Sequence, residues 1–132
     1  MSDSAAGPGF RGSVFDALLR DLSNSLPGVL AAVLVDHEGE CIACATDMGR
    51  SDALITAATS VPLTEQIQGL VSRLAGGVLE RWSMVSESCV MLVEPVGEGN
   101  SLVVVATGVD VAAGVERKLP ECAADLRREA GL

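Results

Sequence analysis

Four cysteines and a single histidine are the residues of this chain best suited to chemistry. Cys41 and Cys44 have the C-x-x-C spacing found in redox motifs and zinc sites. On a regular strand, however, residues i and i+3 point to opposite faces, so one metal ion would not easily bind both thiolates. No second C-x-x-C pair exists, and His37 stands in a predicted hairpin turn. The spacing therefore favours structural thiols and predicts no metal site.

Catalytic patterns are equally sparse. A serine nucleophile needs a partner base, and His37 has no G-x-S-x-G motif to serve. Neighbouring carboxylates such as Glu38 and Glu40 flank a tight turn, where solvated charges are the ordinary explanation. The 97–99 segment (GEG) joins two predicted strands and lacks both the helix and the lysine of a phosphate loop. We therefore expect neither an enzyme nor a bound cofactor.

Four residues are better candidates for contact with a partner than for catalysis. Arg50, Arg73 and Arg81 each carry a guanidinium, the group best suited to phosphates and carboxylates, although solvated surface charge competes as an explanation for each. Trp82 is the only tryptophan, and on a predicted edge strand it can anchor an interface as well as fill a core. The sequence leaves both roles open.

The elements that must position these residues begin with three continuous apolar runs, residues 29–35, 89–93 and 102–106. A strand with one wet face alternates apolar and polar residues, so runs without alternation predict strands buried on both faces. Helices must then cover both sides of the sheet. The expected architecture is a three-layer α/β/α domain.

Helical periodicity and turn signals complete the order of elements. Helices are expected over residues 13–25, 51–75 and 110–130, and two further strands over 40–46 and 78–85. The result is a five-stranded antiparallel sheet in the order α-β-β-α-β-β-β-α. Pro62 and Pro120 fall inside two of the helices, where a proline costs about 3 kcal/mol, so we expect the second helix to kink or restart near Val61 and the third to bend.

Simple dimensions suggest that the chain associates. Five strands about 4.8 Å apart make a sheet roughly 24 Å wide, whereas one helix covers about 10 Å. Each face therefore needs two helices, and only three are predicted. One face should remain half bare in a monomer, and a second copy of the chain would cover it.

Composition limits the classes of partner. The 132 residues suit one domain, which we place at residues 13–132 after a disordered tail at 1–12. A net charge of −9 and only three aromatic residues argue against nucleic acid. No stretch is long and apolar enough for membrane insertion, and residues 1–9 show no signal-peptide pattern, so we expect a cytoplasmic protein. The preference for Arg over Lys, with many Ala and Val, suggests a bacterial origin.

Three turn motifs, together with the order of elements, resemble the roadblock-type dynein light chain family. They are residues 26–29 (LPGV), 35–39 (VDHEG) and 95–102 (PVGEGNSL). The resemblance spans residues 13–130 and implies a roadblock/profilin-like fold without catalytic residues. Members of the family form homodimeric or heterodimeric platforms that bind and regulate Ras-like small GTPases, including bacterial polarity and gliding regulators, or act as cargo adaptors on dynein.

The resemblance also implies pairing through the long second helix and the third strand. The candidate interface residues are Val71, Leu74, Val78, Glu80, Trp82 and Met84. Arg50 and Arg73 are the candidates for contact with the GTPase. The leading hypothesis is a non-catalytic homodimer that regulates a Ras-like small GTPase.

Two other hypotheses remain. One is a scaffold or small-molecule sensor, in which small side chains around Thr56, Ala57 and Thr59 leave a ligand pocket beside the bent helix. The other is a redox protein that uses Cys41 and Cys44.

Overall fold

The computed structural model describes residues 9–131, with the side chains of residues 14–131. Its elements are α1 (Gly9–Asn24), β1 (Val29–Val35), β2 (Cys41–Thr46), α2 (Arg50–Arg73), β3 (Trp82–Val85), β4 (Val90–Gly97), β5 (Asn100–Ala106) and α3 (Val109–Ala130). The strands form one antiparallel sheet in the order β2-β1-β5-β4-β3. The predicted order of elements and the five-stranded antiparallel sheet are confirmed.

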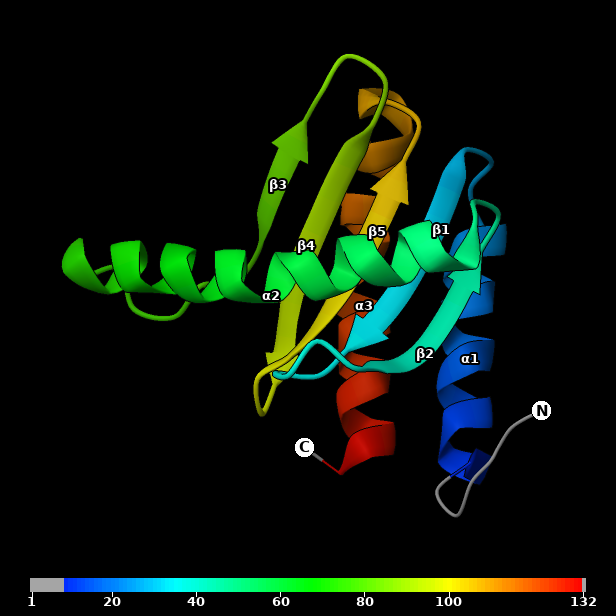
Figure 1. Ribbon diagram of the computed structural model, residues 1–132, viewed down its shortest axis with the longest axis horizontal. Coiled ribbons are helices and arrows are strands. Elements are labelled where there is room, and N and C mark those ends of the chain that lie inside the picture. The colour runs from blue at the N-terminus through cyan, green and yellow to red at the C-terminus, as the bar shows by residue number, and fades with distance from the viewer. Residues whose placement is uncertain (1–8, 132) are drawn as a thin grey trace.

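The molecule has three layers (Figure 1). Helix α2 lies on one face of the sheet, whereas α1 and α3 lie side by side on the other. α1 packs on β1 and β2, and α3 packs on β4 and β5. None of the described helices has the length and apolar character needed to cross a membrane.

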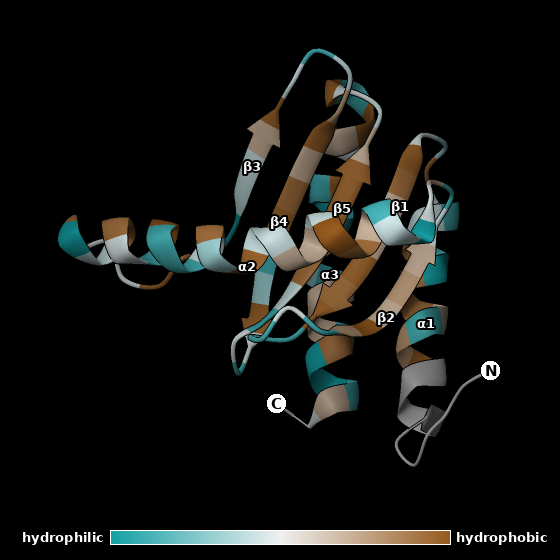
Figure 2. Cartoon of the chain, in the orientation of Figure 1, coloured by the Kyte–Doolittle hydropathy of each residue, from teal (hydrophilic) through white to brown (hydrophobic). Residues whose placement is uncertain are grey.

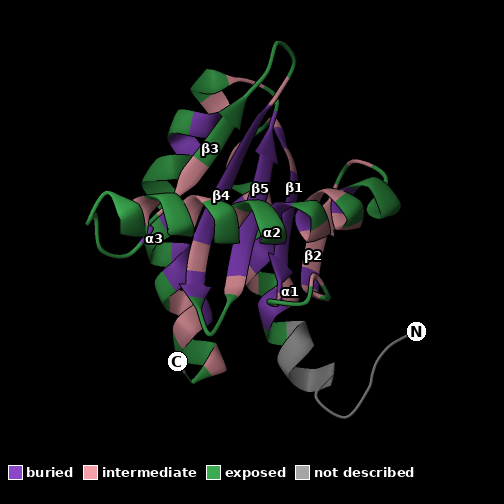
Figure 3. Cartoon of the chain, turned by 60° about the vertical axis from the view of Figure 1, so that its left-hand side comes forward, coloured by how far each residue is buried: buried purple, intermediate pink, exposed green. Residues whose placement is uncertain are grey.

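Side-chain alternation along the buried strands builds two cores, one on each face. Leu34 and Leu102 face α1 and α3, whereas their neighbours Val33 and Val103 face α2. All four are buried, and full burial of such a side chain stabilises the fold by about 1.5–3 kcal/mol. Figure 3 shows the central strands buried along most of their length. This double burial explains the unbroken apolar runs in the sequence.

The expected half-bare face is wrong for the middle of the sheet. On the side of α2, the side chains of Met91, Val93, Val103 and Val105 are all buried in the single chain. The estimate of about 10 Å of sheet covered by each helix assumed that helices run along the strands. Helix α2 instead crosses the strands, so that one helix lies over several of them (Figure 1). Among the described residues, most of the exposed large apolar side chains lie instead in the C-terminal half of α2, in the loop after it and on β3.

β3 is an edge strand, as expected, but it is shorter than the predicted 78–85. The backbone N–H of Leu79 donates to Gln68 Oε1 of α2 over 2.8 Å instead of pairing with a strand. Pairing with β4 begins only at Trp82, opposite Val93. The residues after 93 on β4 are therefore not covered by β3.

Both prolines lie inside continuous helices, so the expected restart of α2 near Val61 is wrong. Hydroxyl groups around Pro62 add bonds to the helix backbone. Thr59, Ser60 and Thr64 donate to the carbonyl oxygens of Ile55, Ala57 and Ser60, over 2.7, 2.7 and 2.8 Å. These bonds give the hydroxyl groups acceptors within the helix, and such bonds often accompany a bend.

The first helix begins at Gly9, before the predicted start at Ser13. Residues 9–12, which composition placed in the disordered tail, are therefore helical. Extending an existing helix costs little once its later turns are packed, and Phe15, Leu19 and Leu22 bury against the sheet. The rest of the predicted tail, residues 1–8, lies outside the described residues.

Candidate functional site

The two edges of the sheet differ in how their backbone is protected. At the β2 edge, α1 packs against the strand, and Asp16 Oδ1 accepts a hydrogen bond from the backbone N–H of Cys44 over 3.2 Å. At the β3 edge, no strand within the described part of the chain pairs with the outer side of residues 82–85. An unprotected edge is a template for another strand. The β3 edge is therefore the one suited to association.

α2 supplies a second surface beside this edge. Its N-terminal half buries small side chains on the sheet, among them Ala53 and Ala57. Its C-terminal half projects past β3 and beyond the sheet (Figure 1). Figure 2 shows hydrophobic residues recurring along that half. Leu63, Leu70 and Leu74 are exposed there, and with Ile67 they follow the 4-3-4 spacing of one helix face.

Two hydrogen bonds hold α2 and the β3 edge in a fixed relation. Trp82 Nε1 donates to Thr64 Oγ1 over 2.9 Å, and the Leu79 N–H donates to Gln68 Oε1 over 2.8 Å. Gln68 Nε2 also donates to the carbonyl oxygen of Gly77 over 3.2 Å. The end of α2, the connecting loop and β3 thus form one preorganised surface, which we call the β3–α2 surface. It comprises residues 63–85.

The candidate interface residues divide into two groups. Leu74 and Val78 are 72% and 82% exposed, and Glu80 and Met84 are also exposed. Val71 and Trp82 are half-buried. The indole of Trp82 packs against the core beneath α2 and is bonded to Thr64, so within one chain it is a core residue at the edge.

Sequence patterns missed two members of this surface. They are Leu63 and Leu70, and neither is among the candidate interface residues predicted from the sequence. Both are exposed in the single chain, Leu63 beside the bonded pair Thr64–Trp82 and Leu70 farther along the helix. The 4-3-4 spacing of residues 63, 67, 70 and 74 indicates one apolar helix face, but it does not show whether that face contacts the chain's own sheet or a partner.

The three arginines lie far apart. Arg50 begins α2 and Arg73 ends it, 24 residues of helix that span about 35 Å, so one small site cannot contain both. Both are exposed, and neither forms an ion pair within the described residues. Arg81 instead forms an ion pair with Glu94 over 2.9 Å and contacts Glu116 over 3.5 Å. Its role is structural.

The two cysteines of β2, Cys41 and Cys44, lie closer to each other than the strand spacing predicts. The register of β2 shifts between Ala43, opposite Leu34, and Cys41, opposite Val35. This bulge places Cys41 and Cys44 against the same core, so the expectation of opposite faces is wrong. Both thiols are free, and no group of three metal-binding side chains occurs in residues 9–131.

The thiols are also poorly activated. Burial, and then the neighbouring Cys44, raises the pKa of Cys41 to about 11. Burial likewise raises the pKa of Cys44, although Arg50 opposes it. A reactive cysteine needs a lowered pKa. The arrangement therefore disfavours the redox hypothesis.

Comparison with known proteins identifies the fold. The family model described as the Roadblock/LC7 domain matches residues 15–106. Among curated proteins, no match to the chain was found.

Solved structures agree with the family model. A Roadblock/LC7 domain from Streptomyces avermitilis is 21% identical, with a TM-score of 0.80 over 89% of this chain and 98% of that one. The gliding protein MglB from Thermus thermophilus is 17% identical, with a TM-score of 0.81 over 99% and 98% of the two chains. A structure described as MglB with tetrameric arrangement is 18% identical, also with a TM-score of 0.81, over 99% and 98%. By its family match and its fold, the chain belongs to the Roadblock/LC7 domain family.

Proposed function

We propose that this protein is a non-catalytic homodimer that binds and regulates a Ras-like small GTPase in the bacterial cytoplasm. The observation that carries the dimer is the β3–α2 surface, in which an open strand edge adjoins an overhanging apolar helix. Membership of the Roadblock/LC7 family and the similarity to MglB, a gliding protein, support the regulatory role.

The geometry favours a symmetric pair. If β3 pairs antiparallel with β3 of a second copy, the two sheets become one, and the overhang of each α2 reaches across to the other subunit. α2 contacts β1, β2 and β5 of its own sheet, so its own β3 edge has the least cover. The overhang of the partner's α2 would lie over that region. Such an isologous contact buries the same residues twice.

Several apolar side chains would be buried together in this dimer. They are Leu63, Leu70, Leu74, Val78 and Met84, each exposed in the single chain. Stable interfaces bury about 1,200–2,000 Å² in total, so both the strand pairing and the two helix overhangs would have to contribute.

Regulation would work through positioning rather than through chemistry supplied by this protein. Phosphoryl transfer is accelerated mainly by orienting groups and stabilising charge, so a rigid platform can change hydrolysis by ordering the GTPase's own residues. Arg50 and Arg73 are suited to carboxylates on the GTPase, since they are exposed and without ion pairs inside the described chain.

Nucleotide assays test this function. GTP hydrolysis and nucleotide release by each Ras-like GTPase of the same cell would be measured with and without the protein. We expect a change in one of these rates for one GTPase. Arg50→Ala and Arg73→Ala should weaken the effect, whereas Arg128→Ala, at an exposed arginine of α3 that pairs with Asp125, should not. Absence of binding to every such GTPase would refute the proposal.

The alternative of a small-molecule sensor rests on a pocket around three residues of α2, Thr56, Ala57 and Thr59. Ala57 is buried against the sheet, and the Thr59 hydroxyl donates to the carbonyl oxygen of Ile55. These side chains serve packing and the helix backbone. A cavity exists elsewhere, between the end of the sheet and the helices.

A further inference from the structure

We propose that the cavity beside the uncovered end of β4 binds a small monocarboxylate with an apolar body. This inference does not depend on the GTPase function.

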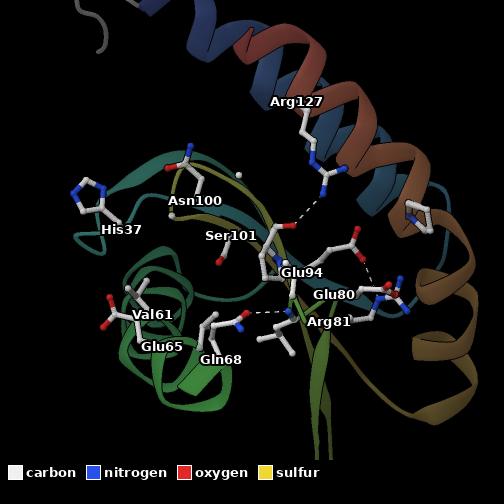
Figure 4. Close-up of a pocket in the computed structure, with 17 residues that line it drawn as sticks. His37, Val61, Glu65, Gln68, Glu80, Arg81, Glu94, Asn100, Ser101 and Arg127 are labelled. Carbon is white, nitrogen blue, oxygen red and sulfur yellow. Dashed lines mark hydrogen bonds and ion pairs between the residues drawn. The ribbon is translucent and has the colours of Figure 1, made fainter. Parts of the chain in front are cut away.

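The cavity exists because β3 is short. Strand β4 continues to Gly97, whereas β3 pairs with it only up to Val93. The space beside residues 94–97 is bounded by α2, by α3 and by the loop before β3 (Figure 4). Its volume is about 750 Å³, within the range of about 300–1,000 Å³ that is typical of small-molecule sites.

A buried hydroxyl group lines this cavity without a partner. Ser101 is only 4% exposed, and its Oγ makes no hydrogen bond with any group in the described part of the chain. Figure 4 shows this side chain on the side of the cavity next to α2. A buried hydroxyl that lacks a hydrogen bond costs about 1–3 kcal/mol. A bound polar group would remove that cost.

The guanidinium of Arg127 lies on the side of the cavity that α3 forms, opposite α2 (Figure 4). Arg127 of α3 points toward the end of β4, where its Nη2 donates to the carbonyl oxygen of Pro95 over 3.2 Å (Figure 4). Within the described residues no carboxylate pairs with Arg127, whereas Arg81 contacts Glu94 and Glu116. A guanidinium held in place and bonded only to a neutral carbonyl is suited to one carboxylate.

The remaining walls restrict the ligand further. Val61, Val78, Leu79 and Pro120 supply an apolar lining suited to a short hydrocarbon body. Glu65 and Glu80 are exposed and also line the cavity, so they would repel a ligand with several negative charges, such as a nucleotide. A ligand with one carboxylate and an apolar body fits these walls, and a further polar group that bonds to Ser101 would strengthen its binding.

The segment 78–81 lines the cavity and also belongs to the β3–α2 surface. Val78 and Glu80 line the cavity and are also candidate interface residues. The ligand is therefore tested on the protein in its native oligomeric state.

Hexanoate is the probe, with hexylamine and hexanol as controls of the same length. It would be titrated into ¹⁵N-labelled protein by NMR. We expect saturable shifts of the Ser101 amide and of the Arg127 Nε–H signal with hexanoate and much smaller shifts with either control. Arg127→Gln should weaken binding about tenfold or more, because it removes the charge that the carboxylate meets.

Arg128→Gln is the matched control variant. Arg128 is the next residue on α3, pairs with Asp125 and does not line the cavity, so its loss should leave hexanoate affinity unchanged. Three results would overturn the proposal: shifts that do not saturate, equal shifts with hexylamine or hexanol, or unchanged affinity in a folded Arg127→Gln protein. Dissociation of hexanoate binding from GTPase regulation in these variants separates this inference from the proposed function.

Discussion

The carboxylate of Glu94 is buried beneath a single close counter-charge. Its side chain is 7% exposed, and that of its partner Arg81 is 27% exposed. Removing one partner of a buried pair leaves a charge without compensation, whereas replacing both can be nearly neutral.

Arg81→Ala should therefore lower the free energy of unfolding by about 2–3 kcal/mol, less than for a fully buried pair because solvent reaches the guanidinium. Urea unfolding measures this loss. The double variant Arg81→Met/Glu94→Leu should recover most of it, and Glu116→Gln should change stability by about 0.5 kcal/mol or less. Equal losses in the single and double variants would show that the ion pair is not the cause.

A glycine in the β4–β5 turn tests close packing against the β1–β2 turn. Gly99 has φ +79°, and a Cβ added there would lie 2.7 Å from His37 Cβ. Gly77 has φ +81° with no atom within 4 Å of such a Cβ. The two positions share the backbone strain and differ in the contact.

Gly77→Ala should cost about 1 kcal/mol from the left-handed backbone alone. Gly99→Ala should cost about 1–3 kcal/mol more, because the two turns must separate. Thermal unfolding of both variants compares them directly. Adding His37→Gly should remove the extra cost, and its persistence in that background would contradict the contact.

The raised pKa of Cys41 has two consequences. Because burial keeps the thiol protonated, iodoacetamide should label Cys41 far more slowly in the folded protein at about pH 8 than in urea. The folded-state pKa of about 11 exceeds the ordinary value of 9.0, so the folded chain binds more protons than the unfolded chain between them. Stability should hold below pH 9.0 and fall as the pH rises toward 11. Cys41→Ala should reduce this fall; rapid labelling of the folded protein would contradict the account.

At the scale of elements, the proline inside α2 predicts the direction in which a substitution changes the free energy of unfolding. Pro62 is exposed and removes one backbone hydrogen bond from a continuous helix. Pro62→Ala should raise the free energy of unfolding by about 1–3 kcal/mol. Pro27→Ala, in the turn before β1, should instead lower it by about 0.4–1 kcal/mol through the unfolded chain. Circular dichroism during urea unfolding measures both changes, and a loss of stability in Pro62→Ala would contradict the prediction.

The elements that sequence predicted best are those whose signal is local. Strands β1, β4 and β5 are buried on both faces, so their sequences are continuously apolar. Such a run predicts a buried strand without any knowledge of the other elements. The predicted start of β3 at residue 78 was wrong because the Leu79 N–H binds the Gln68 side chain of α2 instead of a neighbouring strand. The bulge in β2 was missed because pairing with β1, rather than composition, determines it.

The candidate site was predictable to a similar extent. Polar residues beside Trp82 marked β3 as an edge strand, and the edge is where the structure has it. The overhang of α2 depends on where the helix crosses the sheet, which no local pattern contains. The cavity beside β4 was missed for the same reason, since it results from the unequal lengths of β3 and β4.

At the scale of the whole molecule, apolar burial must outweigh charge repulsion. Each chain carries a net charge of −9, so two copies repel each other at low ionic strength. Salt screens that repulsion over about 10 Å at 0.1 M and leaves the burial of apolar side chains intact. Association through the β3–α2 surface should therefore strengthen with added salt, the opposite of an interface built on ion pairs.

One substitution on α2 separates this surface from general surface effects. Leu70 and Ile55 lie on the same helix and are 57% and 64% exposed, but only Leu70 is on the overhang. Leu70→Asp places a charge in the proposed interface, whereas Ile55→Asp places one outside it.

Sedimentation velocity over a dilution series measures association most directly. The wild-type chain and Ile55→Asp should have a molecular mass of twice 13.5 kDa in solution, and Leu70→Asp should have a mass of 13.5 kDa. A wild-type protein that remains at 13.5 kDa at the highest concentration would contradict the account.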